Sequence, residues 1–362
     1  MRLLNCFTLE FEEFLGLKTP PYAILSHTWG ENEVTFSDYR SHQQLTPRSN
    51  SRGFEKILKF CNLALHDSYG YAWVDTCCID KTSSAELSEA INSMYKWYAD
   101  SKRCYVYLND FDSKDPKCDL VTRGWTLQEL IAPSDIHFYD EKWRYFANKS
   151  ELGTTLSAIT GIDILVLNGA NPLHRISVAK RMSWAAKRTT TREEDLAYCL
   201  LGIFSITLPL VYGEGPRAFL RLQEEIIKET NDLTLFAWQA EVDTLLDTPY
   251  RGILAKSPLE FKTAKTITSN YSHKTNPEFA MTNKGLKIRT ILRTGSDESV
   301  LISLNCHGGG GGEGTMCIYL VHIGEGVYAR DMPHKLGLQP VNFTWEEKSI
   351  YITKDVKELR DL

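Results

Sequence analysis

The chain has 362 residues, of which 43% are apolar and 24% are charged, and its formal net charge is −5. These values are typical of a globular protein with two or three packed units. The sequence shows no basic face and no apolar run long enough to span a bilayer, so we expect neither a nucleic-acid partner nor a membrane.

The nine cysteines are an odd count with no Cys-x-x-Cys pair. The neighbours Cys77 and Cys78 would face opposite sides of a strand, and so could not bind one metal ion. Cysteine as a small buried residue in a reducing compartment is the favoured interpretation. It predicts a cytoplasmic protein, and we expect no metal site.

The first part of the chain alternates between short apolar runs and helical patterns. The apolar runs, which we interpret as buried strands, are residues 22–25, 71–80, 104–108 and 136–139. The helical patterns cover residues 53–70, a stretch that begins at the capping serine Ser83, and residues 124–133. This alternation predicts an α/β domain, a parallel sheet with helices on both faces and right-handed crossovers.

Polar and aromatic residues follow the first two predicted strands. They are Ser26, His27 and Trp29 after the first strand, and Asp80 and Lys81 after the second. Ligands of open α/β sheets bind beyond the carboxyl ends of the strands. We therefore expect these side chains to meet at one cleft, although a polar turn around a half-buried tryptophan explains the first group equally well.

The segment of residues 121–133 follows the third predicted strand and contains Glu129. Trp125 precedes Glu129 by one helical turn, so the indole and the carboxylate share a face of the helix. Asp75 lies inside the second apolar run, where an unpaired carboxylate is costly. We expect it to be paired, to cap a loop or to contact a ligand, and a structural partner is favoured over a ligand.

The remaining chain divides into a helical segment and a β-rich segment. Helical patterns cover residues 177–187 and 193–204 and begin again at Pro216. Apolar alternation with period two then predicts an antiparallel sheet of residues 280–282, 285–289, 300–304, 316–321 and 350–352, with a hairpin turn at residues 323–327. We predict three domains, at residues 1–145, 146–240 and 241–362.

Three blocks of the first domain resemble the signature blocks of fungal heterokaryon-incompatibility (HET) domains. They are Tyr-Ala-Ile-Leu-Ser-His-Thr-Trp-Gly at residues 22–30, Trp-Val-Asp-Thr-Cys-Cys-Ile-Asp-Lys at residues 73–81, and Arg-Gly-Trp-Thr-Leu-Gln-Glu-Leu at residues 123–130. The blocks stand in the order that these domains show. Residues 184–223 resemble the helical extension often found behind them.

The HET fold in turn resembles TIR domains, which are flavodoxin-like α/β proteins. Several TIR domains hydrolyse NAD through a glutamate in a Trp-Cys-x-x-Glu-Leu stretch, and residues 125–130 read Trp-Thr-Leu-Gln-Glu-Leu, with Thr126 in place of the cysteine. The resemblance implies that Glu129 is the catalytic carboxylate of an NAD glycohydrolase. It further implies activation by self-association, no added cofactor, and a role in fungal non-self recognition and programmed cell death.

Cleavage of the nicotinamide–ribose bond suits a site with one dominant acid. Positive charge develops on the anomeric carbon, and nicotinamide leaves as a neutral base, so one carboxylate near the ribose suffices. Ser26, His27 and Trp29 would hold phosphate, ribose or base, Trp125 would hold a flat ring, and the pair Asp80 and Lys81 would gate the cleft. The chain has no Walker loop and no Gly-x-Gly-x-x-Gly after a strand, which disfavours kinase or redox use of a nucleotide.

Two other functions remain open from the sequence. The first is a non-catalytic assembly module of the same fold, in which Glu129 lies in an interface or a salt bridge. The second is a hydrolase with Cys77 or Cys78 as nucleophile and His27 as base. The second is disfavoured, because a reactive thiol needs an electropositive and partly exposed setting.

Overall fold

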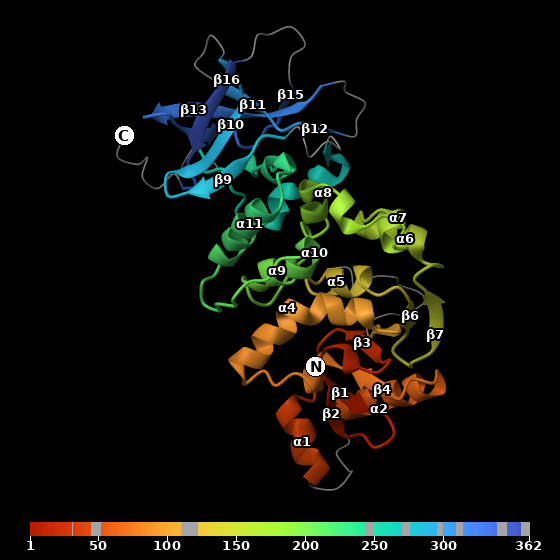
Figure 1. The fold of residues 1–362 in the computed structure, drawn as a ribbon. Coiled ribbons are helices and arrows are strands. Elements are labelled where there is room, and N and C mark those ends of the chain that lie inside the picture. The colour runs from red at the N-terminus through yellow and green to blue at the C-terminus, as the bar shows by residue number, and fades with distance from the viewer. Residues whose placement is uncertain are drawn as a thin grey trace. The chain divides into compact units, whose positions relative to one another are not determined.

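The structure is a computed structural model that describes residues 1–30, 32–44, 52–109, 122–242, 249–269, 276–294, 300–308, 314–338 and 346–355. Contacts divide the chain into two compact units (Figure 1). The N-terminal unit comprises Met1–Asn171 and Tyr198–Leu210, and the C-terminal unit comprises Pro172–Ala197 and Val211–Leu362. This division does not test the three-domain organisation, which stays a prediction.

The N-terminal unit is built on a seven-stranded sheet with the order β2-β1-β4-β3-β5-β6-β7. Its strands are β1 Arg2–Asn5, β2 Phe11–Glu13, β3 Ala23–His27, β4 Tyr71–Trp73, β5 Arg103–Tyr107, β6 Ile136–Tyr139 and β7 Tyr145–Asn148. The neighbours β4, β3, β5 and β6 pair in parallel, which confirms the predicted α/β class. The antiparallel strands β1, β2 and β7 extend the two edges and are absent from the sequence prediction.

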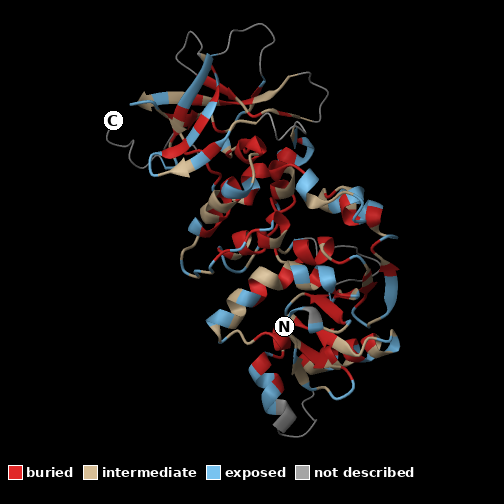
Figure 2. Ribbon diagram, viewed as in Figure 1, coloured by how far each residue is buried: buried red, intermediate tan, exposed pale blue. Residues whose placement is uncertain are grey.

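The parallel strands have the spatial order second, first, third, fourth in the chain. This order also occurs in flavodoxin-like folds, where the direction of winding reverses between the first and third strands. In this sheet the reversal lies between β3 and β5. All five residues of β3 are buried, as Figure 2 shows for the centre of the sheet.

Helices cover both faces of this sheet. On one face, α2 (Arg52–His66) packs Phe60 against Tyr105, with ring centroids 5.4 Å apart. On the other, α4 (Ser84–Asp100) packs Tyr98 against Trp73, with centroids 5.9 Å apart. The register of β3 with β4 and β5 places these ring pairs on opposite sides, which we call the α2 face and the α4 face. Doubly covered sheets of this kind were expected from the alternating pattern.

The other helices of the N-terminal unit are short. They are η1 Gly16–Lys18, α1 Phe36–Gln44, α3 Asp75–Cys78, α5 Thr126–Ile131, α6 Gly153–Thr160, α7 Ile164–Leu167 and α10 Leu201–Phe204. The prediction of a single helix over residues 193–204 is wrong, because turn residues separate α9 (Asp195–Tyr198) from α10. The break lets Gly202 approach α4 so closely that a Cβ atom there would lie 2.0 Å from Cβ of Tyr95.

The prediction of a strand over residues 71–80 is also wrong in its second half. Strand β4 ends at Trp73, and the amide of Cys78 donates to the carbonyl of Val74, which closes the single helical turn α3. Asp75 therefore lies in the first turn of a helix, where a negative charge is favourable. The turn buries Cys77 and Cys78.

The C-terminal unit combines short helices with a mostly antiparallel sheet. Its helices are η3 Leu173–Arg175, α8 Val178–Ser183, α11 Arg217–Glu229, η4 Leu233–Phe236, η6 Pro258–Phe261 and η7 Ala264–Thr266. Its strands are β8 Thr268–Ser269, β9 Phe279–Thr282, β10 Gly285–Thr294, β11 Val300–Ser303, β12 Cys306–His307, β13 Met316–Gly324, β14 Val327–Asp331, β15 Gly337–Leu338 and β16 Glu346–Ile352. The five predicted strands are confirmed, and the predicted hairpin turn joins β13 to β14.

The main sheet of this unit closes on itself. Strands follow the order β11-β10-β16-β14-β13, and β11 also pairs with β13. One pair, β14 with β16, is parallel, which departs from the purely antiparallel sheet predicted from the sequence. Closure leaves few unpaired edges for other chains to join.

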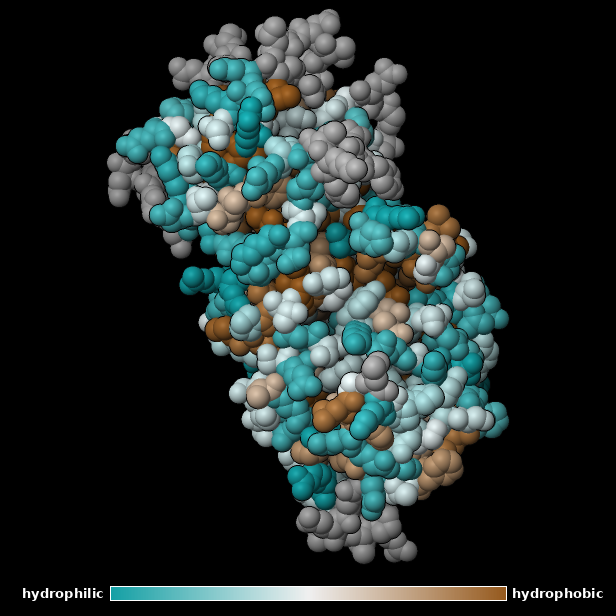
Figure 3. Space-filling view, in the orientation of Figure 1, coloured by the Kyte–Doolittle hydropathy of each residue, from teal (hydrophilic) through white to brown (hydrophobic). Residues whose placement is uncertain are grey.

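On the face of the N-terminal unit shown in Figure 3, hydrophilic residues surround small hydrophobic patches. Within the described residues, no helix combines the length and the apolar character that crossing a membrane requires.

Candidate functional site

A cleft of about 570 Å³ lies at the carboxyl ends of the parallel strands of the N-terminal unit. Thr28 and Gly30 follow β3, Tyr107 ends β5, and Trp143 follows β6. The other described residues that line it are Asn32, Glu33, Arg52, Gly53, Glu55, Lys56, Lys59, Asn109 and Glu141. The cleft thus opens where winding reverses between β3 and β5, which is where open α/β sheets bind ligands.

Glu129 lies on the buried helix α5, and its side chain points to β3. The hydroxyl of Ser26 donates a hydrogen bond of 2.5 Å to Oε2 of Glu129. The residue is 8% exposed and is not among the described residues that line the cleft. Ser26 and Glu129 were both predicted as site residues, and the structure brings them together on the α4 face.

Burial is the main cause of the shifted pKa of Glu129. It raises the pKa of this carboxyl to about 8, and the negative charge of Asp75 raises it further, whereas the hydrogen bond from Ser26 and the charge of Arg123 act in the opposite direction. No ion pair involves Glu129 among the residues that the structure describes. At neutral pH the carboxyl is therefore mostly protonated.

His27 follows Ser26 in β3 and so points to the opposite face of the sheet. Its Nε2 lies 3.5 Å from Oε2 of Glu33, and its Nδ1 lies 3.9 Å from Oδ1 of Asp75. Lys56 on α2 completes the group with an ion pair of 2.5 Å to Glu33. His27 and Ser26 therefore do not act on the same face, in contrast to the single set that was predicted.

The charges of this second group stabilise one another. Burial alone would raise the pKa of Glu33, but the hydrogen bond and charge of His27 and the charge of Lys56 outweigh burial and lower the pKa to about 2. Neither Glu33 nor Lys56 was predicted as a site residue. Glu33 lies in residues 31–51, which have no periodic pattern, and Lys56 lies in the helical pattern of residues 53–70, which does not mark a site.

Trp29 and Lys81 meet at Asp75. The indole Nε1 of Trp29 donates to Oδ2 of Asp75 at 2.8 Å, and Nζ of Lys81 lies 3.8 Å from the same oxygen. The ammonium of Lys81 also lies 3.3 Å from the centroid of the Trp29 ring, a cation–π contact. Asp75 thus has the structural partners that were expected, and Lys81 covers one face of the ring predicted to stack on a ligand.

The remaining predicted site residues, Asp80 and Trp125, are not joined to these groups by any described contact. Oδ1 of Asp80 accepts hydrogen bonds from the amide and hydroxyl of Thr82, so it stabilises its own loop. These bonds lower the pKa of Asp80. Trp125 is half-buried and directly precedes α5.

An aromatic pair at the cleft was also missed. The rings of Tyr107 and Trp143 stack with centroids 4.4 Å apart and an interplanar angle of 17°. Trp143 has a φ of 60°, a backbone conformation that a non-glycine residue seldom adopts. The only sequence signal was its place shortly after the fourth predicted strand.

Cys77 and Cys78 do not form a reactive site. Cys77 and Cys78 are buried, and desolvation raises the pKa of Cys77 well above its usual value, so its reactive thiolate is disfavoured. Within the part of the chain that the structure describes, no three His, Cys, Asp or Glu side chains are grouped as a metal-binding set.

Comparison with known proteins links the N-terminal unit to one family. Residues 22–118 match the family model described as heterokaryon incompatibility protein (HET), and residues 217–291 match a domain of unknown function, DUF8212. The vegetative incompatibility protein HET-E-1 of Podospora anserina is 46% identical over 229 residues, which cover 59% of this chain and 16% of that protein. The two HET matches support the resemblance of the N-terminal blocks to the HET protein family. No solved structure matches the chain significantly.

Proposed function

We propose that the N-terminal unit cleaves the bond between nicotinamide and ribose in NAD, with Glu129 as the catalytic carboxyl. The observation that carries this proposal is a buried acid that has no ionic partner among the described residues and is hydrogen-bonded to Ser26 of β3, the strand next to the reversal point of the parallel sheet. Structural carboxylates are usually paired, and a buried carboxyl with a strongly shifted pKa is a candidate functional group. The TIR-like relationship of the HET fold belongs to this proposal.

The reaction follows from the charge that develops on the ribose. As the bond between the anomeric carbon and the nicotinamide nitrogen breaks, its electron pair stays on the nitrogen and neutralises the pyridinium ring. The ribose becomes an oxocarbenium ion, which the carboxylate of Glu129 stabilises. Water then bonds to the anomeric carbon and releases a proton, giving ADP-ribose, or a nitrogen of the adenine bonds there and gives a cyclic product.

The protonation of Glu129 couples to substrate binding. In the free protein its pKa is about 8, so most molecules hold a neutral acid at pH 7. The pyridinium ring of NAD carries a positive charge, and a nearby positive charge favours the ionised carboxyl. Substrate binding therefore lowers the pKa of Glu129 and produces the carboxylate that the reaction needs, while a ribose hydroxyl replaces Ser26 as its hydrogen-bond donor.

The cleft offers groups suited to the rest of the dinucleotide. Arg52 and Lys59 line it as basic residues on α2, which suits two phosphates. The stacked pair Tyr107 and Trp143 supplies an aromatic wall for a base. Glu129 does not line this cleft, and we propose that self-association opens its bond to Ser26 and lets the carboxyl reach the cleft.

The biological role that we propose is a vegetative incompatibility response, carried out in the cytoplasm. It is supported by the HET match and by the name of the similar Podospora protein. This chain spans 16% of the length of that protein, so the role is proposed for the shared segment.

The burial of Glu129 also supports a second function, a non-catalytic assembly module. An acid that is 8% exposed and hydrogen-bonded to a strand is suited to fixing α5 against the sheet. In that case Glu129 determines folding and assembly, and no bond is cleaved.

Nicotinamide release from NAD by the purified chain, with and without a crowding agent, separates the two functions. Glu129→Gln keeps the shape and the acceptor for Ser26 but removes the ionisable group, and we expect turnover to fall by about 100-fold or more. Glu10→Gln, at an exposed position, is the matched control and keeps the wild-type rate. Absence of turnover in the wild-type chain under every assembly condition would reject the enzyme and leave the assembly module.

A further inference from the structure

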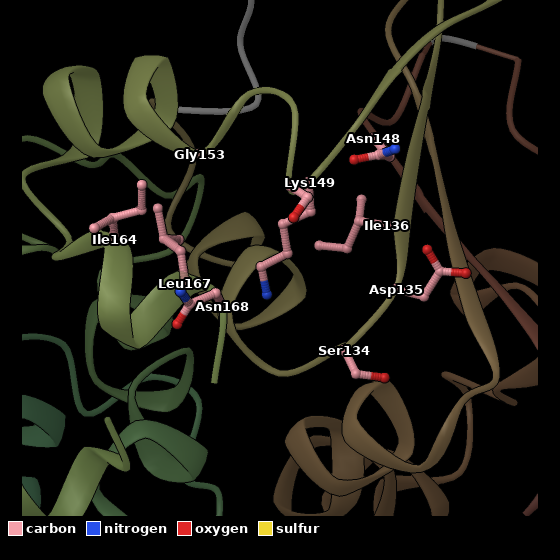
Figure 4. Close-up of a pocket in the computed structure, with 10 residues that line it drawn as sticks. Ser134, Asp135, Ile136, Asn148, Lys149, Gly153, Ile164, Leu167 and Asn168 are labelled. Atoms are coloured by element: carbon pink, nitrogen blue, oxygen red, sulfur yellow. The ribbon is translucent and has the colours of Figure 1, made fainter. Parts of the chain in front are cut away.

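The N-terminal unit contains a second cavity of about 360 Å³ at the far end of α5. Its described lining residues, shown in Figure 4, are Ser134, Asp135, Ile136, Asn148, Lys149, Ser150, Gly153, Ile164, Leu167 and Asn168. The volume is within the range of pockets that hold small molecules. The proposed NAD site uses none of these residues.

Lys149 extends into the middle of this cavity. Figure 4 shows its side chain running between Ile136 on one side and Leu167 and Asn168 on the other. The residue is 6% exposed, and its Nζ donates to the carbonyls of Ile131 at 3.2 Å and Pro133 at 2.8 Å. These two bonds cap the C-terminal end of α5, where a positive charge is favourable.

The two capping bonds use only part of the hydrogen-bonding capacity of the Lys149 ammonium and leave its charge unpaired. An ammonium carries three N–H donors, and two are used by neutral carbonyls. No carboxylate lies within ion-pair distance of Lys149 among the described residues. The buried positive charge is therefore uncompensated, and desolvation lowers the pKa of Lys149 to about 8.

The one carboxylate that lines the cavity is already neutralised elsewhere. Asp135 accepts a hydrogen bond of 2.7 Å from Nε of Arg103, and its other oxygen lies 3.3 Å from Nε2 of His137. Its charge is thus directed to β5 and β6 and away from Lys149. The cavity retains a net positive group at its centre, flanked by hydroxyl and amide side chains and by an apolar wall of Ile164 and Leu167.

We propose that this cavity binds a small organic anion, whose carboxylate or phosphate accepts the third N–H of Lys149 and whose apolar tail packs against Ile164 and Leu167. The amide of Asn168 and the hydroxyl of Ser134 are further donors at the cavity. The anion supplies the negative partner that the described residues do not provide, because a buried ammonium is much more stable when paired. Carboxylate and phosphate share this chemistry, and the choice between them is decided by experiment.

Three probes with the same butyl tail test the proposal: pentanoate, butyl phosphate and neutral 1-butanol. Calorimetric titration of the full chain should give saturable binding of at least one anion, in about the millimolar range expected for so few atoms. Butanol should bind at least about tenfold more weakly, since it has no charge to pair with Lys149. The tighter of the two anions identifies the head group.

Variants locate the binding. Lys149→Met keeps the apolar stem and should weaken anion binding by at least about tenfold. Lys142→Met removes an exposed lysine and should leave the affinity for the anion unchanged. If Lys149→Met fails to fold, Ile164→Trp fills the cavity while leaving the ammonium in place, and it should abolish binding. A wild-type chain that binds neither anion, or anion binding that survives these changes, overturns the proposal. These readouts are independent of NAD cleavage.

Discussion

The two faces of the N-terminal sheet differ in whether their buried ionisable side chains have charged partners. On the α2 face, Glu33 is paired with Lys56 and flanked by His27, and its pKa is lowered to about 2. On the α4 face, Glu129 lies in α5 and accepts a hydrogen bond from Ser26, while Lys149, which follows β7, caps the C-terminal end of α5. Neither side chain has a charged partner within ion-pair distance in the part of the chain that the structure describes. Their pKa values converge on about 8 from opposite sides.

The difference indicates where function is to be sought. A paired buried charge is fixed, because separating it from its partner leaves both groups desolvated. An unpaired buried charge is held at a free-energy cost, and a ligand of opposite charge relieves that cost. We therefore propose that His27, Glu33 and Lys56 on the α2 face stabilise the fold, and that Glu129 and Lys149 on the α4 face take part in ligand chemistry.

The largest effect that tests this contrast is the loss of stability in Glu33→Gln. The change leaves Lys56 buried without a counter-ion, and we expect the free energy of unfolding to fall by about 3–5 kcal/mol. Urea unfolding followed by circular dichroism measures it. Glu13→Gln removes a carboxylate that is 74% exposed from its contact with Arg2, and should cost under about 1 kcal/mol. Equal losses in the two variants would remove the contrast.

A pH-dependent gain of stability in Glu129→Gln is the next largest effect. The folded-state pKa of Glu129 is raised from 4.5 to about 8, so its stabilising protonated form is fully present below pH 4.5 and lost as the pH rises through 8. Glutamine has no such loss. The variant should match the wild type near pH 4.5 and exceed it by roughly 3–4 kcal/mol at pH 7, since each pH unit between 4.5 and 8 costs the wild type about 1.4 kcal/mol.

Urea unfolding at pH 5, 7 and 9 measures this gain, and a difference that does not change with pH would show that Glu129 is ionised in the folded protein. Glu10→Gln again serves as control, because Glu10 is exposed.

Lys81→Met should produce the smallest effect. It removes the ammonium from the face of the Trp29 ring, a contact at a half-exposed site that we expect to contribute about 0.5–1 kcal/mol. Because this change also uncovers the indole, NAD should bind no more weakly than to the wild type. Thermal unfolding and NAD titration are the two measurements. A loss of several kcal/mol would mean that Lys81 belongs with the fixed charges.

Much of the N-terminal fold was predictable from the sequence because its signals are local. Apolar runs such as residues 22–25 and the stripe around Tyr98 identified the parallel strands and α4. Residues 71–80 were misread because apolar periodicity does not separate a strand from one helical turn that buries two cysteines. Strands β1 and β2 were not predicted because they are only four and three residues long.

The sequence predicted which residues belong to the candidate site, but not which of them contact one another. The order of elements placed Ser26 and Glu129 near one edge, and their hydrogen bond bears this out. Ser26 and His27 point to opposite faces because neighbouring residues of a strand alternate, and this required knowing that β3 extends to His27. The roles of Glu33 and Lys149 follow from contacts with residues distant in the sequence, Lys56 for Glu33 and the carbonyl of Ile131 for Lys149. Missing charge partners are visible only once the fold is known.

The initial rate of nicotinamide release from NAD, measured from pH 5 to pH 9 for the wild type and Glu129→Gln, tests the central claim most directly. If the ionised carboxyl of Glu129 cleaves NAD, the wild-type value of kcat/KM rises about tenfold per pH unit and levels off near pH 8, whereas the variant is slower by about 100-fold at the plateau. A Glu129→Gln variant that keeps the wild-type rate and pH profile would contradict the account.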